Sequence, residues 1–222
     1  MTSADRPDTT GSRPRGGSTE KRNAILQAAR KVFGRDGYAR ASIDVIAAEA
    51  GASTRTLYNH FGGKEALFTE TLTGSASEVA AAQTAMVSRH LDDVTDLEAA
   101  LVALGYDWVT STVREQFADH FAMVRQINSE AAHFPAASLQ AWQEAGPRRV
   151  HRELAKRLEQ LQAEGRLRVA KPARAAHHFV VLIGSEVSER TFGGVAPLDD
   201  ADLREIVTDG VRAFLTGYLP HG

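Results

Sequence analysis

The sequence contains no cysteine among its 222 residues, which excludes disulfide bonds and metal sites with thiolate ligands. It also lacks long hydrophobic runs, because the longest strongly apolar stretch covers only residues 179–183. A membrane-spanning helix needs about 20 such residues. The first residues lack the apolar segment of a secretory signal, so we expect a cytoplasmic protein without a membrane span. A hydrophobic fraction of 43% with 24% charged residues is typical of a globular chain.

Charge is distributed unevenly along the chain. Residues 1–64 contain 11 Lys and Arg against 6 Asp and Glu, whereas residues 65–222 contain 15 against 22. A basic N-terminal region is a plausible place for a polyanion such as nucleic acid. A short basic segment is more often only a solvated surface, so the charge alone leaves both interpretations open.

The apolar spacing predicts an all-α protein. Residues 1–18 are rich in Gly, Pro, Ser, Thr and Arg without apolar periodicity, which predicts a disordered tail. From Thr19 onward apolar residues recur at helical spacing, and a short strand at 166–171 is the one alternative. The expected helices run from residue 19 to a stop at Gly37, and then over 43–50, 54–61, 64–89, 95–113, 116–130, 136–145, 147–164, 173–190 and 199–218.

Residues 43–62 fit the physical requirements of a helix-turn-helix. Gly51 provides the turn, and Ile46 and Leu57 supply apolar contacts between the two helices. Two core helices joined by a glycine turn would have the same inner face. The outer face of the second helix favours DNA, because it carries a dense set of hydrogen-bonding side chains: Thr54, Arg55, Tyr58, Asn59 and His60.

A larger set of residues at fixed spacing supports this interpretation. The set comprises Ile25-Leu26, Ala28-Ala29, Phe33, Gly37-Tyr38, Ser42, Ile46-Ala47, Ala50-Gly51, Leu57-Tyr58, His60-Phe61, Lys64-Glu65 and Leu67-Phe68. In this pattern, residues 19–68 resemble the N-terminal DNA-binding domain of TetR-family transcriptional regulators. Two positions depart from the family pattern, since Arg55 stands where glycine is frequent and Gly63 where a serine or asparagine cap is common.

The resemblance continues more loosely toward the C-terminus. Residues 127–184 are similar to the C-terminal domain of AefR-like repressors in the same family, with Phe134-Pro135 and Gly146-Pro147 among the matching positions. The resemblance implies a helix-turn-helix domain at 19–66 and a larger ligand-binding and dimerisation domain at 67–222. No cofactor is expected.

Family resemblance and helix geometry together predict the DNA contacts. We expect Thr54, Arg55 and Asn59 to face base edges. Contacts to phosphates are expected from Ser42, Tyr58, His60 and Lys64.

Apolar residues on the helices that surround the ligand cavity in the family predict a pocket, although each is more often simply core. The predicted pocket residues are Trp108, Phe117, Phe121, Val124, Ile127, Phe134 and Trp142, with His133 or Gln126 as polar contacts.

Other constellations are weaker. The adjacent His177 and His178 would point about 100° apart on a helix and cannot grip one metal ion as an i, i+4 pair can. The carboxylates at Asp92, Asp93 and Asp96 are better explained as residues of a helix-to-helix turn. No catalytic motif is present, so an enzyme on an all-α scaffold is a weak alternative.

The sequence therefore predicts a homodimeric repressor that binds a palindromic operator and leaves it when a small apolar or amphipathic molecule binds. Helices 147–164 and 172–190 should pair across a two-fold axis, through an apolar stripe that includes Phe179, Leu182 and Ile183. The alternative of the same fold is a ligand-independent or architectural DNA-binding protein.

Overall fold

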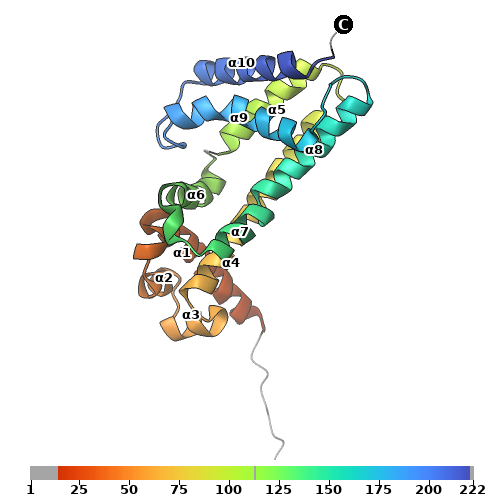
Figure 1. Cartoon of the computed structure of the whole chain (residues 1–222). Helices are drawn as coiled ribbons and strands as arrows, with labels where there is room; N and C mark the ends of the chain where they lie inside the picture. The colour runs from red at the N-terminus through yellow and green to blue at the C-terminus, as the bar shows by residue number, and fades with distance from the viewer. Residues whose placement is uncertain (1–14, 113, 221–222) are drawn as a thin grey trace, which may run out of the picture.

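The computed structural model describes residues 15–112 and 114–220, and every regular element within them is helical (Figure 1). The elements are α1 (Arg15–Arg40), α2 (Ile43–Glu49), α3 (Thr54–Phe61), α4 (Lys64–Leu91), α5 (Leu97–Ser111), η1 (Glu115–Phe117), α6 (Ala118–Glu130), η2 (Ala131–His133), α7 (Ala136–Ala145), α8 (Pro147–Ala163), α9 (Pro172–Arg190) and α10 (Asp200–Tyr218). The all-α prediction is confirmed. Residues 166–171 form an irregular connection rather than a strand.

The ends of the first helices follow from local chemistry. Ser42 and Ser53 cap α2 and α3 by accepting hydrogen bonds from backbone N–H groups two and three residues ahead, and Gly62 ends α3 in the left-handed conformation. At Gly37 the backbone of α1 leaves the helical region, with φ 74° and ψ 170°. Because α1 begins at Arg15, residues 15–18 are helical and not part of a disordered tail. The rest of that predicted tail, residues 1–14, lies outside the described residues.

The first of two hydrophobic cores lies under the helix-turn-helix. It joins α1–α4 to α6 and α7 through an aromatic cluster in which the rings of Phe33 and Phe68 are 5.0 Å apart and those of Phe68 and Phe134 are 5.3 Å apart. Met123 and Ile127 of α6 complete this core, with 1% and 4% exposure. The N-terminal domain therefore buries its apolar face partly against the C-terminal part of the chain.

The second core joins α5, α8, α9 and α10 to the C-terminal half of α4. The long helix α4 thus belongs to both cores, with Leu72 in the first and Val87 in the second. In Figure 1 it runs from the helix-turn-helix end to the other end of the molecule, first beside α7 and then beside α8. Salt bridges such as Arg30–Glu78, at 2.9 Å, fasten α1 to it.

The apolar stripe of α9 lies inside one chain. Phe179 and Ile183 are 0% exposed, and the ring of Phe179 is 5.4 Å from that of Phe214 on α10. Packing is so close that a Cβ at Gly210 would collide with the carbonyl group of Leu182. The prediction that this stripe pairs across a two-fold axis is therefore corrected: most of it packs on neighbouring helices of the same chain, and Leu182, 39% exposed, is its one partly open member.

Candidate nucleic-acid interface and ligand cavity

The turn between α2 and α3 holds the second helix against the core. Gly51 has a φ of 61°, a conformation that glycine adopts without strain, and the N–H of Ala52 donates to the carbonyl of Ala47 at 2.9 Å. Ile46 and Leu57 are both 0% exposed. This packing fixes which side of α3 faces outward.

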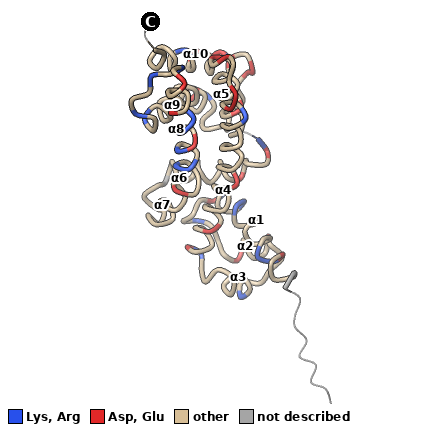
Figure 2. Tube along the Cα trace, turned by 90° about the vertical axis from the view of Figure 1, so that its right-hand side faces the viewer, with Lys and Arg blue, Asp and Glu red and all other residues tan. Residues whose placement is uncertain are grey.

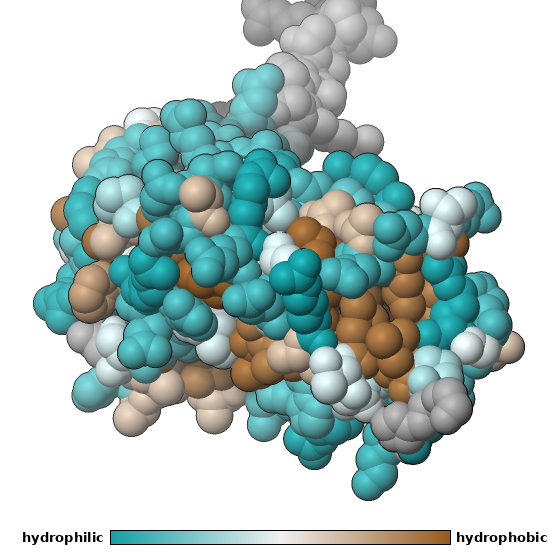
Figure 3. Space-filling view, turned by 90° about the horizontal axis from the view of Figure 1, so that it is seen from above, coloured by the Kyte–Doolittle hydropathy of each residue, from teal (hydrophilic) through white to brown (hydrophobic). Residues whose placement is uncertain are grey.

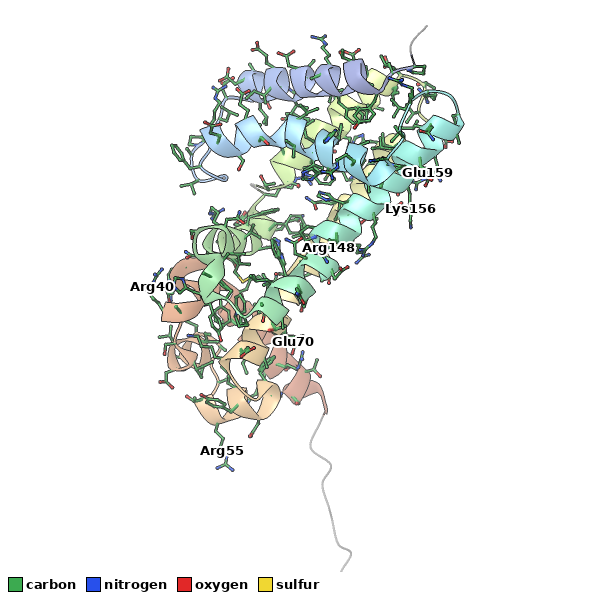
Figure 4. The ribbon with its side chains drawn as sticks, viewed as in Figure 1. Arg40, Arg55, Glu70, Arg148, Lys156 and Glu159 are labelled. Atoms are coloured by element: carbon green, nitrogen blue, oxygen red, sulfur yellow. The ribbon has the colours of Figure 1, made fainter. Side chains whose placement is uncertain are left out.

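The outward side of α3 carries most of the predicted base-reading and phosphate-binding residues. Arg55 points away from the ribbon at the end of the molecule (Figure 4), Tyr58 is 50% exposed and Asn59 is exposed. Thr54 and His60 lie half-buried at the edges of this face. The helix carries no acidic residue, as the charge distribution in Figure 2 shows. A convex, exposed and acid-free helix of this kind can enter the major groove of DNA.

Asp44 is a residue of this surface that the sequence interpretation missed. The Thr54 hydroxyl donates its hydrogen bond to the Asp44 carboxylate across the two helices, at 3.0 Å. With its proton engaged, the hydroxyl oxygen can only accept a further hydrogen bond. The signal in the sequence was an acidic residue two positions after the Ser42 cap, which by itself indicates only a stabilised helix N-terminus.

Two of the predicted phosphate-binding residues, Ser42 and Lys64, form hydrogen bonds within the protein. The Ser42 hydroxyl accepts a hydrogen bond from the Asp44 N–H at 3.2 Å. The Lys64 ammonium donates to the carbonyl of Ala39 at 3.1 Å and lies 5.0 Å from the centre of the Tyr38 ring, and burial lowers the pKa of Lys64. Lys64 therefore fastens the start of α4 to the end of α1. As the sequence suggested, Gly63 gives α4 no side-chain cap.

Arg40 is a second residue that the sequence interpretation missed. It lies in the last turn of α1, directly before α2, and is exposed (Figure 4). Figure 4 shows it on the same domain as Arg55 but well away from that residue. A single arginine within a basic stretch of sequence gave no signal that could single it out.

A cavity of about 270 Å³ lies beside the first core, between α4, α5, α6, α7 and α8. Four of the predicted pocket residues line it, namely Trp108, Phe121, Val124 and Trp142. A second cavity of about 340 Å³ lies between α5, α6 and α9. The two adjoin, because they share Trp108, Thr112, Phe121, Val124 and Asn128. We call them the inner and the outer cavity.

The remaining predicted pocket residues lie elsewhere. Ile127 and Phe134 belong to the first core, because they lie on the sides of α6 and of the following segment that face the helix-turn-helix. Phe117 is half-buried in η1 and lines neither cavity. His133 is exposed, and the Gln126 amide donates to the carbonyl of Gly34 at 3.4 Å. These five residues are therefore removed from the candidate pocket.

Two histidines that the sequence interpretation missed line the inner cavity. His120 is 5% exposed, and its Nδ1 lies 2.9 Å from the Ser75 hydroxyl. Burial, with a smaller contribution from the Arg30 cation, lowers the pKa of His120 to about 4. Burial and the nearby His177 also lower the pKa of His151. His120 is therefore neutral near pH 7. Isolated histidines have no spacing that a sequence pattern could detect.

The fold and the exposed face of α3 define a helix-turn-helix protein with an attached helical domain. Residues 25–71 match the model of bacterial regulatory proteins of the tetR family, and residues 99–220 match the C-terminal domain of AefR-like transcriptional repressors. The chain belongs to the TetR family of transcriptional regulators. A search of curated proteins gives no match.

Solved structures share the whole architecture. A TetR-family regulator from Mesorhizobium loti MAFF303099 is 27% identical with a TM-score of 0.81, covering 94% of this chain and 100% of that one. The flavonoid-responsive regulator FrrA is 27% identical with a TM-score of 0.69, covering 92% and 100%. A TetR-family regulator from Pseudomonas syringae pv. tomato DC3000 is 27% identical with a TM-score of 0.63, covering 91% and 98%.

No helix in 15–112 or 114–220 is long and apolar enough to cross a membrane. Within the same ranges, no group of three or more His, Asp or Glu side chains is arranged to hold a metal ion.

Proposed function

We propose that the protein is a homodimeric transcriptional repressor that binds a palindromic operator and releases it when a small apolar or amphipathic molecule occupies the inner cavity. Each subunit would insert α3 into one major groove, so the two-fold symmetry of the dimer would require two half-sites on one face of the DNA. Such a regulator would act in the cytoplasm and carry out no catalysis.

One observation carries this proposal: the helix that lines the cavity also packs directly on the DNA-binding domain. Phe121 and Val124 of α6 face the cavity, while a Cβ at Gly34 of α1 would lie 3.0 Å from that of Ala122 on the same helix. A ligand that moves α6 would therefore move α1 and, with it, α2 and α3. Only a difference in ligand affinity between the DNA-binding and released conformations can drive the release.

The walls of the inner cavity favour an aromatic effector. Two tryptophans and one phenylalanine line it together with neutral polar groups. FrrA, which is similar to this chain over almost its whole length, is named as flavonoid-responsive. We therefore infer an effector with aromatic rings, without naming a compound.

The test has two stages. Random double-stranded DNA would first be selected on the purified protein, and the enriched sequence should be a palindrome whose half-site centres are separated by about one helical turn. Aromatic compounds would then be screened for displacement of the labelled operator. Failure to enrich any sequence would contradict the DNA-binding proposal.

The second candidate function is DNA binding without ligand control. This alternative would be expected to have a filled interior at the predicted pocket, and the two adjoining cavities argue against it. If the operator is selected but no compound that binds the protein changes operator affinity, this alternative holds.

A further inference from the structure

The outer cavity contains a single charged side chain. Among the residues that line the two cavities, Arg125 is the only lysine, arginine, aspartate or glutamate. It is half-buried on α6. Its guanidinium donates one hydrogen bond, at 3.3 Å, to the carbonyl of Gly193 in the α9–α10 connection. No carboxylate in the described part of the chain forms an ion pair with it.

This arrangement leaves most of a cation's hydrogen-bonding capacity unused. A guanidinium has five N–H donors, and a partly desolvated charge is costly unless an opposite charge compensates it. Arginine binds carboxylate and similar anions through two parallel hydrogen bonds, which makes it suited to planar anionic groups. An unpaired arginine at the wall of an apolar cavity therefore points to an anionic ligand group.

The rest of the two cavities is neutral and rich in apolar surface. Trp108, Phe121 and Val124 line both cavities, and Trp142 and the neutral His120 line the inner cavity. The glycine pair in the α9–α10 connection has left-handed φ values of 69° and 90°, and a Cβ at Gly193 would lie 3.5 Å from the Arg125 stem. The connection thus lies directly against the stem of the arginine and accepts a hydrogen bond from its guanidinium.

We propose that the two cavities form one elongated site for an amphipathic aromatic anion. The carboxylate or sulfonate group of the ligand binds Arg125, and its rings extend past Trp108 and Phe121 into the inner cavity. This inference rests on the proposed ligand-responsive function and names the chemical class of the ligand. The inner cavity alone would accept a neutral aromatic molecule, whereas Arg125 selects for negative charge.

Two fluorescent probes with the same ring system test the charge requirement. 8-Anilinonaphthalene-1-sulfonate carries a sulfonate that the neutral N-phenyl-1-naphthylamine lacks, and both brighten in apolar surroundings. Each would be titrated into the full-length protein, with binding stoichiometry measured for each probe. We expect the wild type to bind one sulfonate molecule per chain, and more tightly than the neutral probe.

The decisive variant is Arg125→Gln, with Arg174→Gln as its matched control, because Arg174 is exposed on α9 and lines neither cavity. Arg125→Gln should weaken the sulfonate probe about tenfold or more and leave the neutral probe within about twofold, as expected for loss of a charge-assisted hydrogen bond. Arg174→Gln should change neither affinity. Arg125→Lys should recover part of the sulfonate affinity, since it restores the charge without the planar geometry. Val124→Trp places a larger side chain where the two cavities adjoin, so it should block the binding of both probes.

Three outcomes would overturn the proposal. An unchanged sulfonate affinity in Arg125→Gln would exclude Arg125 as the anion contact, and an equal loss of both probes would assign the arginine a structural role through Gly193. Failure of the wild type to bind either probe would remove the site itself. None of these outcomes affects selection of an operator, so the DNA-binding part of the proposed function stands or falls separately.

Discussion

Arg55 is the side chain whose surroundings most clearly separate base reading from structural support. It is exposed on the outer face of α3, and no ion pair holds it within the described residues. Arg55→Ala should weaken operator binding by about 1–3 kcal/mol and relax the preference at one base position. Titrations against the operator and its single-base variants measure both effects. Lys64→Ala should instead weaken all sequences alike and reduce the salt slope by about one unit. If Arg55→Ala behaves as Lys64→Ala is expected to, α3 does not read bases through Arg55.

The pair Asp44 and Thr54 should also shape the base preference. The Thr54 hydroxyl donates to Asp44, so its oxygen presents only an acceptor to the groove and suits the amino groups of cytosine or adenine. Asp44→Ala frees the hydroxyl to donate, and the preference at one position per half-site should broaden toward bases that offer acceptors. Glu49→Ala is the control, because Glu49 is also an exposed acid on α2 but its carboxylate accepts a hydrogen bond from Arg35 and not from Thr54. Both variants should gain non-specific affinity, and a site selection that broadens equally in both would contradict this role of Asp44.

His120 should make the folded state sensitive to acid. Its pKa is about 4 in the folded protein and about 6.5 when unfolded, so only the unfolded chain takes up a proton as the pH falls through 6.5. The contribution of the neutral His120 to the free energy of unfolding is therefore fully present above pH 6.5 and is lost as the pH falls toward 4. Between pH 7 and pH 5 the loss should be about 2 kcal/mol. The Arg30 cation adds to the lowering of the His120 pKa, and the Glu78 carboxylate opposes it.

Urea unfolding at the two pH values measures this effect. His120→Asn retains a group that can bond to Ser75 but cannot gain a charge, so its stability should fall by less than that of the wild type over the same interval. Equal losses in both proteins would show that other groups cause the acid sensitivity.

At the scale of whole elements, the α1–α6 contact depends on a glycine. A Cβ at Gly34 would meet that of Ala122 at 3.0 Å and the Asp119 carbonyl at 3.3 Å, whereas a Cβ at Gly74 of α4 would meet nothing within 4 Å. Gly74→Ala should therefore stabilise the protein by about 0.5–1 kcal/mol through helix propensity alone. Gly34→Ala gains the same propensity but must separate the helices, so its net effect should be destabilising. Thermal or urea unfolding gives the change in stability for both variants. Equal stabilisation by the two would mean that α1 and α6 can move apart without an energetic cost.

Helix positions could be predicted from the sequence because they depend on local signals. Capping serines, turn glycines and apolar periodicity lie within a few residues of the ends that they determine, and Ser53 and Gly62 mark the bounds of α3 as expected. Which neighbour an apolar face contacts is a different question. Ile127 has the same side chain whether it lines a cavity or packs on α1, and Phe179 has the same one in a core or in a dimer interface. Which neighbour is contacted depends on how helices distant in the sequence pack together. The local spacing of apolar residues does not determine that packing.

The same limit applies to the candidate sites. Arg55 and Tyr58 could be predicted because an amphipathic helix must expose the face that it does not bury. Asp44, His120 and Arg125 could not, because each acquires its role from a partner on another element of the chain: Thr54, Ser75 and Gly193 respectively.

At the scale of the whole molecule, the two cores make α4 and α6 the connections between the DNA-binding end and the rest of the chain. α4 contributes to both cores, and α6 separates the cavities from α1. By thermodynamic reciprocity, operator DNA must weaken an inducing ligand by the factor by which the ligand weakens DNA.

Dimerisation belongs to this scale too, and the burial of Phe179 changes where it should be tested. The exposed large apolar residues on α9 are Val181 and Leu182, at 43% and 39%. Apolar surface is also visible on the face of the molecule seen from above (Figure 3). A folded subunit would use such residues, not the 0% exposed Phe179, to pair with a second copy.

Leu182→Glu should therefore give a folded monomer with weak affinity for the full palindrome, because a single subunit reads one half-site and a buried, unpaired carboxylate opposes association. Phe179→Ala should cost about 3–5 kcal/mol of folding stability, since it leaves a cavity inside one subunit. Ala137→Glu, on the exposed side of α7, is the surface control and should keep the wild-type assembly. Analytical ultracentrifugation gives the oligomeric state, and circular dichroism reports folding. If Leu182→Glu sediments as a dimer and binds the palindrome like the wild type, this part of α9 is not in the interface. If the wild type sediments as a monomer and still binds the full palindrome tightly, the dimer hypothesis is wrong.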